Sequence, residues 1–200
     1  TQAELARRLL KQPERIQMDH EPTQQNIEQR LHLADNFEHK SRILQHLIRD
    51  VALTQAIIFS ATKQGANDLA EELIAQGHSA AALHGDMTQA ARNRTLMELR
   101  QGKLRLLVAT DVAARGLDIG SVSHVINFDI PRFAEDYVHR IGRTGRAGAP
   151  GTAISFILPD DLAHLERIER FTGHSLQPHT IPGLEPKRPL RRFSKKSQHR

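Results

Sequence analysis

Residues 104–119 read LRLLVATDVAARGLDI, an apolar run that passes directly into a polar loop. The run over residues 104–109 has the length and composition of a buried strand, and the loop combines small residues with Gly116. Short apolar runs of this kind alternate along the chain with helical patterns of about 10–15 residues. The alternation predicts right-handed βαβ crossovers, and therefore an α/β fold with one parallel β-sheet flanked by helices.

The remaining elements are expected in the same alternating order. The Thr62 and Thr88 side chains are expected N-caps, and Gly77 and Gly102 are expected to end the helices that follow them. The expected strands are residues 27–33, 55–60, 79–83, 104–109, 122–128 and 152–158, and the expected helices are 40–49, 62–77, 88–102, 133–141 and 160–170. In a parallel sheet, ligands bind at the carboxyl ends of the strands, so the polar residues directly after each strand are the candidates for a site.

The two ends of the chain differ in pattern from this central domain, which we assign to residues 26–171. Residues 1–18 have the spacing of an amphipathic helix, and the polar residues 19–25 with Pro22 are typical of a linker. Beyond Phe171 the periodicity fades, prolines recur and a basic run follows, so residues 172–200 are predicted to be a disordered tail.

Charge is unevenly distributed along the sequence. The chain has 28 Lys and Arg against 23 Asp and Glu, and seven of the basic residues lie in residues 187–200 without any acid. The rest of the chain therefore carries a formal charge of −2, so a nucleic-acid site on it must be a local patch. The basic tail either binds RNA or serves as a solubilising end, and its composition fits both.

Composition excludes several classes of protein. The absence of cysteine excludes disulfides and thiolate metal sites, and no apolar run approaches the ~18 residues of a membrane-spanning helix. Twelve histidines include His32, His39 and His46 at seven-residue spacing, and His174 and His179. No close pair of them stands with carboxylates in a ligand pattern, so we predict surface histidines and no metal site.

Residues 139–146 read HRIGRTGR and place Arg140, Arg143 and Arg146 three residues apart. No acid occurs between Tyr137 and Pro159, and a guanidinium directs two donors toward phosphate oxygens. Continuation of the preceding helix would put Arg140 and Arg143 on one face. The pattern indicates a phosphate-binding turn, with a solvated basic turn as the alternative.

The loop TDVAARGLDI over residues 110–119 offers two polar groups directly after a strand. Thr110 can donate a hydroxyl hydrogen bond to phosphate, and Asp118 can accept one from a ribose hydroxyl. The alternative is that both side chains only cap local backbone.

Taken together, these two stretches resemble motifs V and VI of superfamily 2 helicases, and the DEAD-box family of ATP-dependent RNA helicases in particular. Residues 57–63 (IIFSATK), the triplet His84-Gly85-Asp86 with Gln89 and Arg92, and residues 125–131 (VINFDIP) agree with that family in order and spacing. The resemblance covers residues 1–170 and implies a single RecA-like lobe, the C-terminal one. It makes residues 1–18 the closing helix of the preceding lobe and residues 19–25 the interlobe linker.

The resemblance also implies roles for individual residues. Arg143 and Arg146 would be catalytic and reach the γ-phosphate of ATP, with Arg146 as the arginine finger. Asp118 would hold the nucleotide ribose. Contacts to the RNA backbone would come from Gln89, Arg92, Thr110 and Gly116, and coupling between the lobes from Arg115, His139 and Arg140.

The sequence lacks the groups that bind the other end of ATP. Its Gly102-Lys103 pair has no upstream glycine of a phosphate-binding loop, and no Asp-Glu-Ala-Asp cluster for Mg²⁺ is present. We therefore expect a monomeric, cytoplasmic lobe without membrane contact that is inactive by itself. Its partners would be sequence-nonspecific single-stranded or duplex RNA and an N-terminal lobe of the same parent chain, which would bind most of the ATP and Mg²⁺.

Two other functions remain open from the sequence. A double-stranded DNA translocase of the same superfamily would share these motifs. A non-catalytic RNA-binding module would rely on the basic tail, although aromatic residues for base stacking are scarce at 4%.

Overall fold

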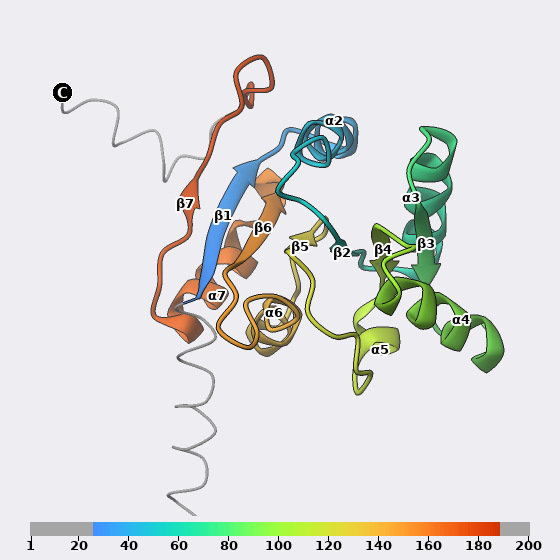
Figure 1. Cartoon of the computed structure of the whole chain (residues 1–200). Helices are drawn as coiled ribbons and strands as arrows, with labels where there is room; N and C mark the ends of the chain where they lie inside the picture. Colours follow the sequence, from blue (N-terminus) through green and yellow to red (C-terminus); the bar gives the residue numbers. More distant parts are fainter. Residues whose placement is uncertain (1–25, 189–200) are drawn as a thin grey trace, which may run out of the picture.

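Seven parallel strands form one sheet in the computed structural model, which describes residues 26–188 (Figure 1). Their order across the sheet is β3-β4-β2-β5-β6-β1-β7. The strands are β1 (Ile27–Leu33), β2 (Ala56–Phe59), β3 (Ala80–Leu83), β4 (Leu106–Ala109), β5 (His124–Asn127), β6 (Gly151–Ile157) and β7 (Gln177–Pro178). The helices are α2 (Phe37–Leu47), α3 (Lys63–Ala75), α4 (Gln89–Arg100), α5 (Asp111–Ala114), α6 (Ala134–Ile141) and α7 (Leu162–Thr172), with a 3₁₀ turn at Pro159–Asp161. The predicted parallel α/β fold is confirmed.

Helix caps lie where the sequence predicts them. The hydroxyl oxygens of Thr62 and Thr88 accept hydrogen bonds from the backbone N–H groups of Gly65 and Ala91. The α2 helix begins three residues earlier than expected because Asn36 caps it, its side chain accepting from the His39 N–H. The four-residue helix α5 was not predicted, since a single turn is too short to show a helical period.

Side chains of the sheet alternate between two packed faces. In β2, Ala56 and Ile58 pack with α2 and α3, whereas Ile57 and Phe59 pack with α4 and α5 on the opposite face. A third cluster joins α6 and α7 to β1 and β6 on the same side as α4 and α5 (Figure 1). Because all strands are parallel, the polar loops that follow them meet at one edge of the sheet.

The C-terminal strap, residues 174–188, is an ordered part of the domain. Its strand β7 pairs with β1, and the side chains of Leu176 and Ile181 are buried. The backbone N–H groups of Lys187 and Arg188 donate to the carboxylate of Asp35. The prediction of disorder from residue 172 onward is therefore wrong for the strap. Prolines are compatible with an edge strand, and a few apolar side chains suffice to anchor an extended segment.

Three expectations fall on residues that the structure does not describe. The closing helix at 1–18, the linker at 19–25 and the part of the basic tail from residue 189 onward lie outside the described range.

Four of the histidines expected at the surface are buried: His32, His39, His84 and His124. The ring of His32 packs edge-on against Phe156, and burial lowers the pKa of His32 to about 4. The ring of His39 lies within hydrogen-bonding distance of the Leu184 carbonyl in the strap. His46 is exposed as predicted. His32 and His39 thus serve packing and backbone contacts within the domain.

No helix within residues 26–188 is long and apolar enough to cross a membrane.

Replacement of Ile181 by alanine tests whether the strap belongs to the folded domain. The side chain of Ile181 projects from the strap into the core. Ile181→Ala should therefore lower the free energy of unfolding by about 2–4 kcal/mol, measured by urea denaturation. The matched control Ile74→Ala removes the same atoms from an exposed position on α3 and should change it by less than about 0.5 kcal/mol. Equal small effects would mean that the strap does not contribute to the fold.

Candidate functional site

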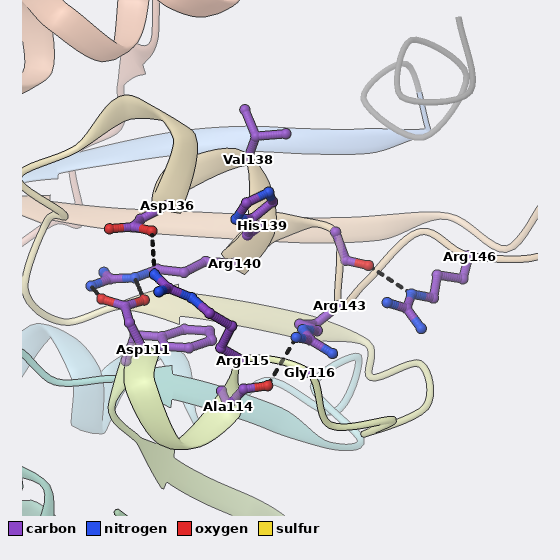
Figure 2. A pocket seen from close by; sticks show the side chains of 12 residues that line it. Asp111, Ala114, Arg115, Gly116, Asp136, Val138, His139, Arg140, Arg143 and Arg146 are labelled. Carbon is purple, nitrogen blue, oxygen red and sulfur yellow. Dashed lines mark hydrogen bonds and ion pairs between the residues drawn. The ribbon is translucent and has the colours of Figure 1, made fainter. Parts of the chain in front are cut away.

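A pocket of about 510 Å³ lies at the carboxyl ends of the central strands (Figure 2). Its walls come from the end of β2, from α5 with the turn after it, and from α6 with the turn after it. The lining residues are Phe59, Asp111, Ala114, Arg115, Gly116, Asp136, Val138, His139, Arg140, Gly142, Arg143 and Arg146. Six of the residues predicted from the sequence therefore lie together: Arg115, Gly116, His139, Arg140, Arg143 and Arg146.

Arg140 is buried at the base of this pocket, with 3% of its surface exposed. Its Nε and Nη2 atoms donate to the two carboxylate oxygens of Asp111, each at 2.6 Å (Figure 2). Its Nη1 donates to the Asp129 carbonyl at 2.6 Å and to the Asn127 side chain at 3.3 Å, and its guanidinium lies over the Phe59 ring. The charge of Arg140 is thus compensated, and its donors are used, within this lobe.

The carboxylate of Asp129 extends this network to α2 and to the end of β2. It accepts from Lys40 Nζ at 3.2 Å and from the Ala61 N–H at 2.8 Å. Lys40 is itself buried and lies over the ring of Phe128. The loop ends around the pocket are therefore held by ion pairs in which a buried cation meets a partly exposed carboxylate.

Arg143 is held by carbonyl oxygens and has no ion pair with the described residues. Its Nη1 donates to the Leu117 carbonyl at 2.6 Å and its Nη2 to the Ala114 carbonyl at 3.0 Å. Partial burial, and next the positive charge of Arg146, lower the pKa of Arg143, which remains charged. Its positive charge is directed into the pocket without an ion pair, and the only acid that acts on it electrostatically among the described residues is Asp118, which raises its pKa in part.

Arg146 is exposed at the pocket margin, and its Nε donates to the Gly142 carbonyl at 2.7 Å (Figure 2). The turn before it is fixed by Thr144, whose buried hydroxyl donates to the carbonyls of Val122 and Ser123. Gly145 has φ +68°, and a Cβ there would stand 2.7 Å from the Ile27 side chain, so only glycine fits. Within the described residues Arg146 also lacks an acidic partner.

The helix α6 ends at Ile141, so it does not continue to Arg143. Arg140 and Arg143 nevertheless both reach the segment 111–117, although the shared helical face expected from the sequence does not form. The turn at Gly142, which follows the helix, brings the Arg143 side chain to the same segment as Arg140.

The remaining predicted residues of the pocket are more exposed. Arg115 Nη2 pairs with Asp136 Oδ1 at 3.2 Å, and the Arg115 side chain is 66% exposed. The His139 side chain is exposed and makes no hydrogen bond to any residue from 26 to 188. Gly116 has φ +74°, which requires glycine at this turn.

Asp118 does not line the pocket. One of its carboxylate oxygens accepts from the Gly120 N–H at 3.2 Å, and its carbonyl accepts from Arg100. Its side chain is exposed on the loop that follows Leu117.

The predicted RNA contacts form a second group, on β3, β4 and α4. Thr110 follows β4 and its N–H donates to the Leu83 carbonyl, which places it beside the loop 84–86. Arg92 approaches the same loop from α4, whereas the Gln89 side chain donates to Asn93 on the helix surface. Gly116 lies with the first group, in the pocket, and not with these three.

Five residues of the pocket network were not among the site residues predicted from the sequence: Asp111, Asp136, Asn127, Asp129 and Lys40. Asp111 lies inside the quoted loop, and a buried arginine requires an acidic partner. However, no local pattern connects positions 111 and 140, which are separated by 29 residues.

The chain matches the model of the helicase conserved C-terminal domain over residues 38–148. It is 43% identical over 187 residues to the ATP-dependent RNA helicase SrmB of Haemophilus influenzae, covering 92% of this chain and 42% of that protein. The chain belongs to the helicase conserved C-terminal domain family. Its resemblance to the C-terminal lobe of DEAD-box proteins is confirmed, and it spans less than half the length of this relative.

Solved structures agree with this assignment. The structure of the Escherichia coli DEAD-box protein SrmB bound to regulator of ribonuclease activity A has a TM-score of 0.79 and 41% identity, covering 82% of this chain and 96% of that one. The Saccharomyces cerevisiae protein Dbp5 bound to RNA and ADP BeF3 has a TM-score of 0.67 and 36% identity, covering 76% of this chain and 41% of that one. The RecA-like fold predicted from the sequence is therefore confirmed.

The pair between Arg140 and Asp111 predicts a large loss of stability when one partner is removed. Asp111→Ala leaves a buried guanidinium without its counterion and should lower the free energy of unfolding by about 3–5 kcal/mol, measured by urea denaturation. The control Asp136→Ala leaves only the exposed guanidinium of Arg115, which water can solvate, without its partner and should cost about 1 kcal/mol or less. Similar losses in the two variants would contradict a special role for the buried pair.

Proposed function

We propose that this chain is the C-terminal lobe of an ATP-dependent RNA helicase, which completes the ATP site and grips RNA for remodelling of RNA duplexes or ribonucleoproteins. The observation that carries the proposal is the position of Arg143 and Arg146 on one pocket, without an acidic partner among residues 26–188. The alternatives of a DNA translocase and of a non-catalytic module receive less support, because the relatives are named ATP-dependent RNA helicases.

Arg143 and Arg146 would act on the γ-phosphate of ATP, with Arg146 as the arginine finger. Both guanidiniums are held by backbone carbonyls, so a phosphoryl group can replace these weaker partners without leaving a buried acid unpaired. Arg146 is more exposed and stands on a fixed turn, which suits a side chain that reaches across to a nucleotide on another lobe. Stabilisation of the charge that spreads over the transferring phosphoryl group is its expected contribution.

Arg140 would serve this site as a positioning residue. Since its donors are used by Asp111, Asn127 and the Asp129 carbonyl, its contribution to coupling between the lobes would be indirect. Arg115 and His139 present exposed side chains and are the better candidates for direct contact with the other lobe.

Asp118 would hold the ribose of the nucleotide. One carboxylate oxygen binds the Gly120 N–H, which leaves the other to accept from a ribose hydroxyl. Its exposure outside the pocket fits a nucleotide that lies between two lobes, with its ribose beyond the arginines.

Contacts with the RNA sugar-phosphate backbone would come from Gln89, Arg92, Thr110 and Gly116, giving binding independent of sequence. Arg92 and Thr110 lie near one loop in the described structure, and similarity to Dbp5 solved with RNA supports a site of this kind. Within residues 26–188 no cluster of three His, Cys, Asp or Glu side chains is arranged to hold a metal ion. We assign the Mg²⁺ that accompanies ATP to the N-terminal lobe.

The isolated chain should not hydrolyse ATP. It should show no RNA-stimulated phosphate release, because its sequence contains neither a phosphate-binding loop nor an acid cluster for Mg²⁺. Addition of the N-terminal lobe should restore turnover in a phosphate-release assay. RNA-dependent release from the pure chain would contradict the proposed division of the site.

The arginine finger is tested in the protein that contains both lobes. Arg146→Lys keeps the charge but loses the planar pair of donors, so kcat for ATP hydrolysis should fall at least ~100-fold. RNA binding in the presence of a nonhydrolysable nucleotide should change much less. Arg92→Lys is the control, with weaker RNA affinity and a smaller effect on kcat at saturating RNA. A near-normal kcat for Arg146→Lys would show that the turn is structural.

A further inference from the structure

Lys63, Asp86 and Arg92 form a charged cluster at the carboxyl ends of β2 and β3, and none of the three lines the arginine pocket. Lys63 Nζ donates to Asp86 Oδ1 at 2.9 Å, and the two side chains are 55% and 71% exposed. Lys63 stands at the start of α3, Asp86 follows β3, and Arg92 lies one turn into α4. Three separate elements thus bring two cations and one acid to one place.

Gly85 leaves room for about one methyl group between the two cations of this cluster, in contact with Lys63 Cε at 3.4 Å. A Cβ on Gly85 would stand 3.6 Å from Lys63 Nζ and 3.9 Å from Arg92 Nη2. The backbone at Gly85 is not left-handed, so its conformation does not require glycine. Because Gly85 has no side chain, a ligand can approach its backbone within reach of both Lys63 and Arg92.

The Arg92 guanidinium, whose Nη2 approaches Gly85, has an unused donor at its Nε. Its Nε is buried and has no hydrogen-bond partner among the described residues. Buried donors in folded proteins are nearly always paired, so an unpaired one indicates a missing acceptor. A phosphate oxygen is an acceptor of the kind that guanidinium groups prefer.

Asp86 is held beside Lys63 by a buried histidine. The Asp86 N–H donates to His84 Nδ1 at 3.2 Å, and His84 Nε2 lies 2.9 Å from the Asn67 side chain on α3. The hydrogen bond from Lys63, and then its charge, lower the pKa of the Asp86 carboxyl, so this carboxylate is ionised at neutral pH. The Asp86 carboxylate is therefore already paired with Lys63, one of the two cations of the cluster.

We propose that Asp86 is a built-in competitor of RNA phosphate: in the free lobe it binds Lys63, and a phosphate of the RNA backbone lying across Gly85 takes Lys63 from it while bonding Arg92. The inference rests on the proposed RNA-binding role of Arg92 and adds Lys63 and Asp86 to that site. Exposed ion pairs are weak in water, so the exchange is easy in both directions. The competition lowers the affinity for RNA and favours release, as a protein that must let go of its product after each cycle requires.

A double-mutant cycle on this chain tests the competition directly. The probe is a labelled single-stranded RNA of mixed sequence and about ten nucleotides, titrated at constant salt. Asp86→Asn keeps the shape of the side chain and its backbone contact with His84, and it should raise RNA affinity about two- to fivefold, the range of a surface ion pair. In a Lys63→Gln background, which should itself bind more weakly, the same change should have little effect.

The matched control is Asp68→Asn, which removes the same charge from an exposed position on α3, where the side chain bonds Gln64. It should change RNA affinity no more than Asp86→Asn does in the Lys63→Gln background. An equal gain from Asp86→Asn with and without Lys63 would mean general charge repulsion and would overturn the competition. So would the absence of any gain in the presence of Lys63.

Two further variants separate this inference from the function on which it rests. Gly85→Ala should weaken RNA binding without changing the melting temperature, because the added methyl group fills the space between the cations while meeting only the flexible ends of side chains. If Arg92→Lys leaves RNA affinity unchanged, the proposed RNA site fails, and the competition with it. If Arg92→Lys weakens binding while Asp86→Asn fails to strengthen it, only the competition is overturned.

Discussion

The buried pair of Arg140 and Asp111 is the interaction on which the pocket depends. A guanidinium with 3% of its surface exposed is costly unless its charge and its donors are matched, and Asp111, Asn127 and the Asp129 carbonyl match them. These partners lie on α5, at the end of β5 and in the loop after it. Because Arg140 needs all of these partners, it fixes the positions of α5, the end of β5 and the following loop relative to α6. One of these segments, α5 with the turn after it, also supplies the carbonyl oxygens that hold Arg143.

The parallel sheet determines where such a network can form. Every described strand points the same way, so each loop that follows a strand emerges at one edge, and charged residues from different elements meet there. Two cationic sites result, the arginine pocket near β4, β2 and β5, and the cluster of Lys63 and Arg92 near β3. Local sites of this kind are compatible with the net formal charge of −2 outside residues 187–200.

The sequence predicted the elements that depend on neighbouring residues, and it missed those that depend on contacts between residues far apart in the chain. Strand and helix periods, together with the caps at Thr62 and Thr88, depend on residues within a few positions of one another, and the structure confirms them. The strap was missed because its order comes from burial of Leu176 and Ile181 in clusters built from many parts of the chain, and the prolines obscured that signal. The burial of His39 was missed for the same reason, since its partner is a carbonyl in the strap. In the candidate site, the motif located the arginines, but it could not show which acid each one meets.

The three arginines of the motif are equally spaced in sequence, yet their environments in the structure differ. The two glycines between them cause this difference. Gly142 ends α6 after Arg140, so that Arg140 remains on the helix and points into the lobe. Gly145 then turns the chain after Thr144, whose hydroxyl fixes the backbone to Val122 and Ser123. Along the motif the guanidiniums change from fully paired, to bound by carbonyls within the pocket, to exposed at its margin. Stabilisation of a developing charge requires donors whose positions are set before the reaction begins. In this lobe the buried Arg140 and the hydrogen-bonded Thr144 fix the backbone of the motif. Arg146, exposed at the pocket margin, is the arginine that a ligand from outside could reach.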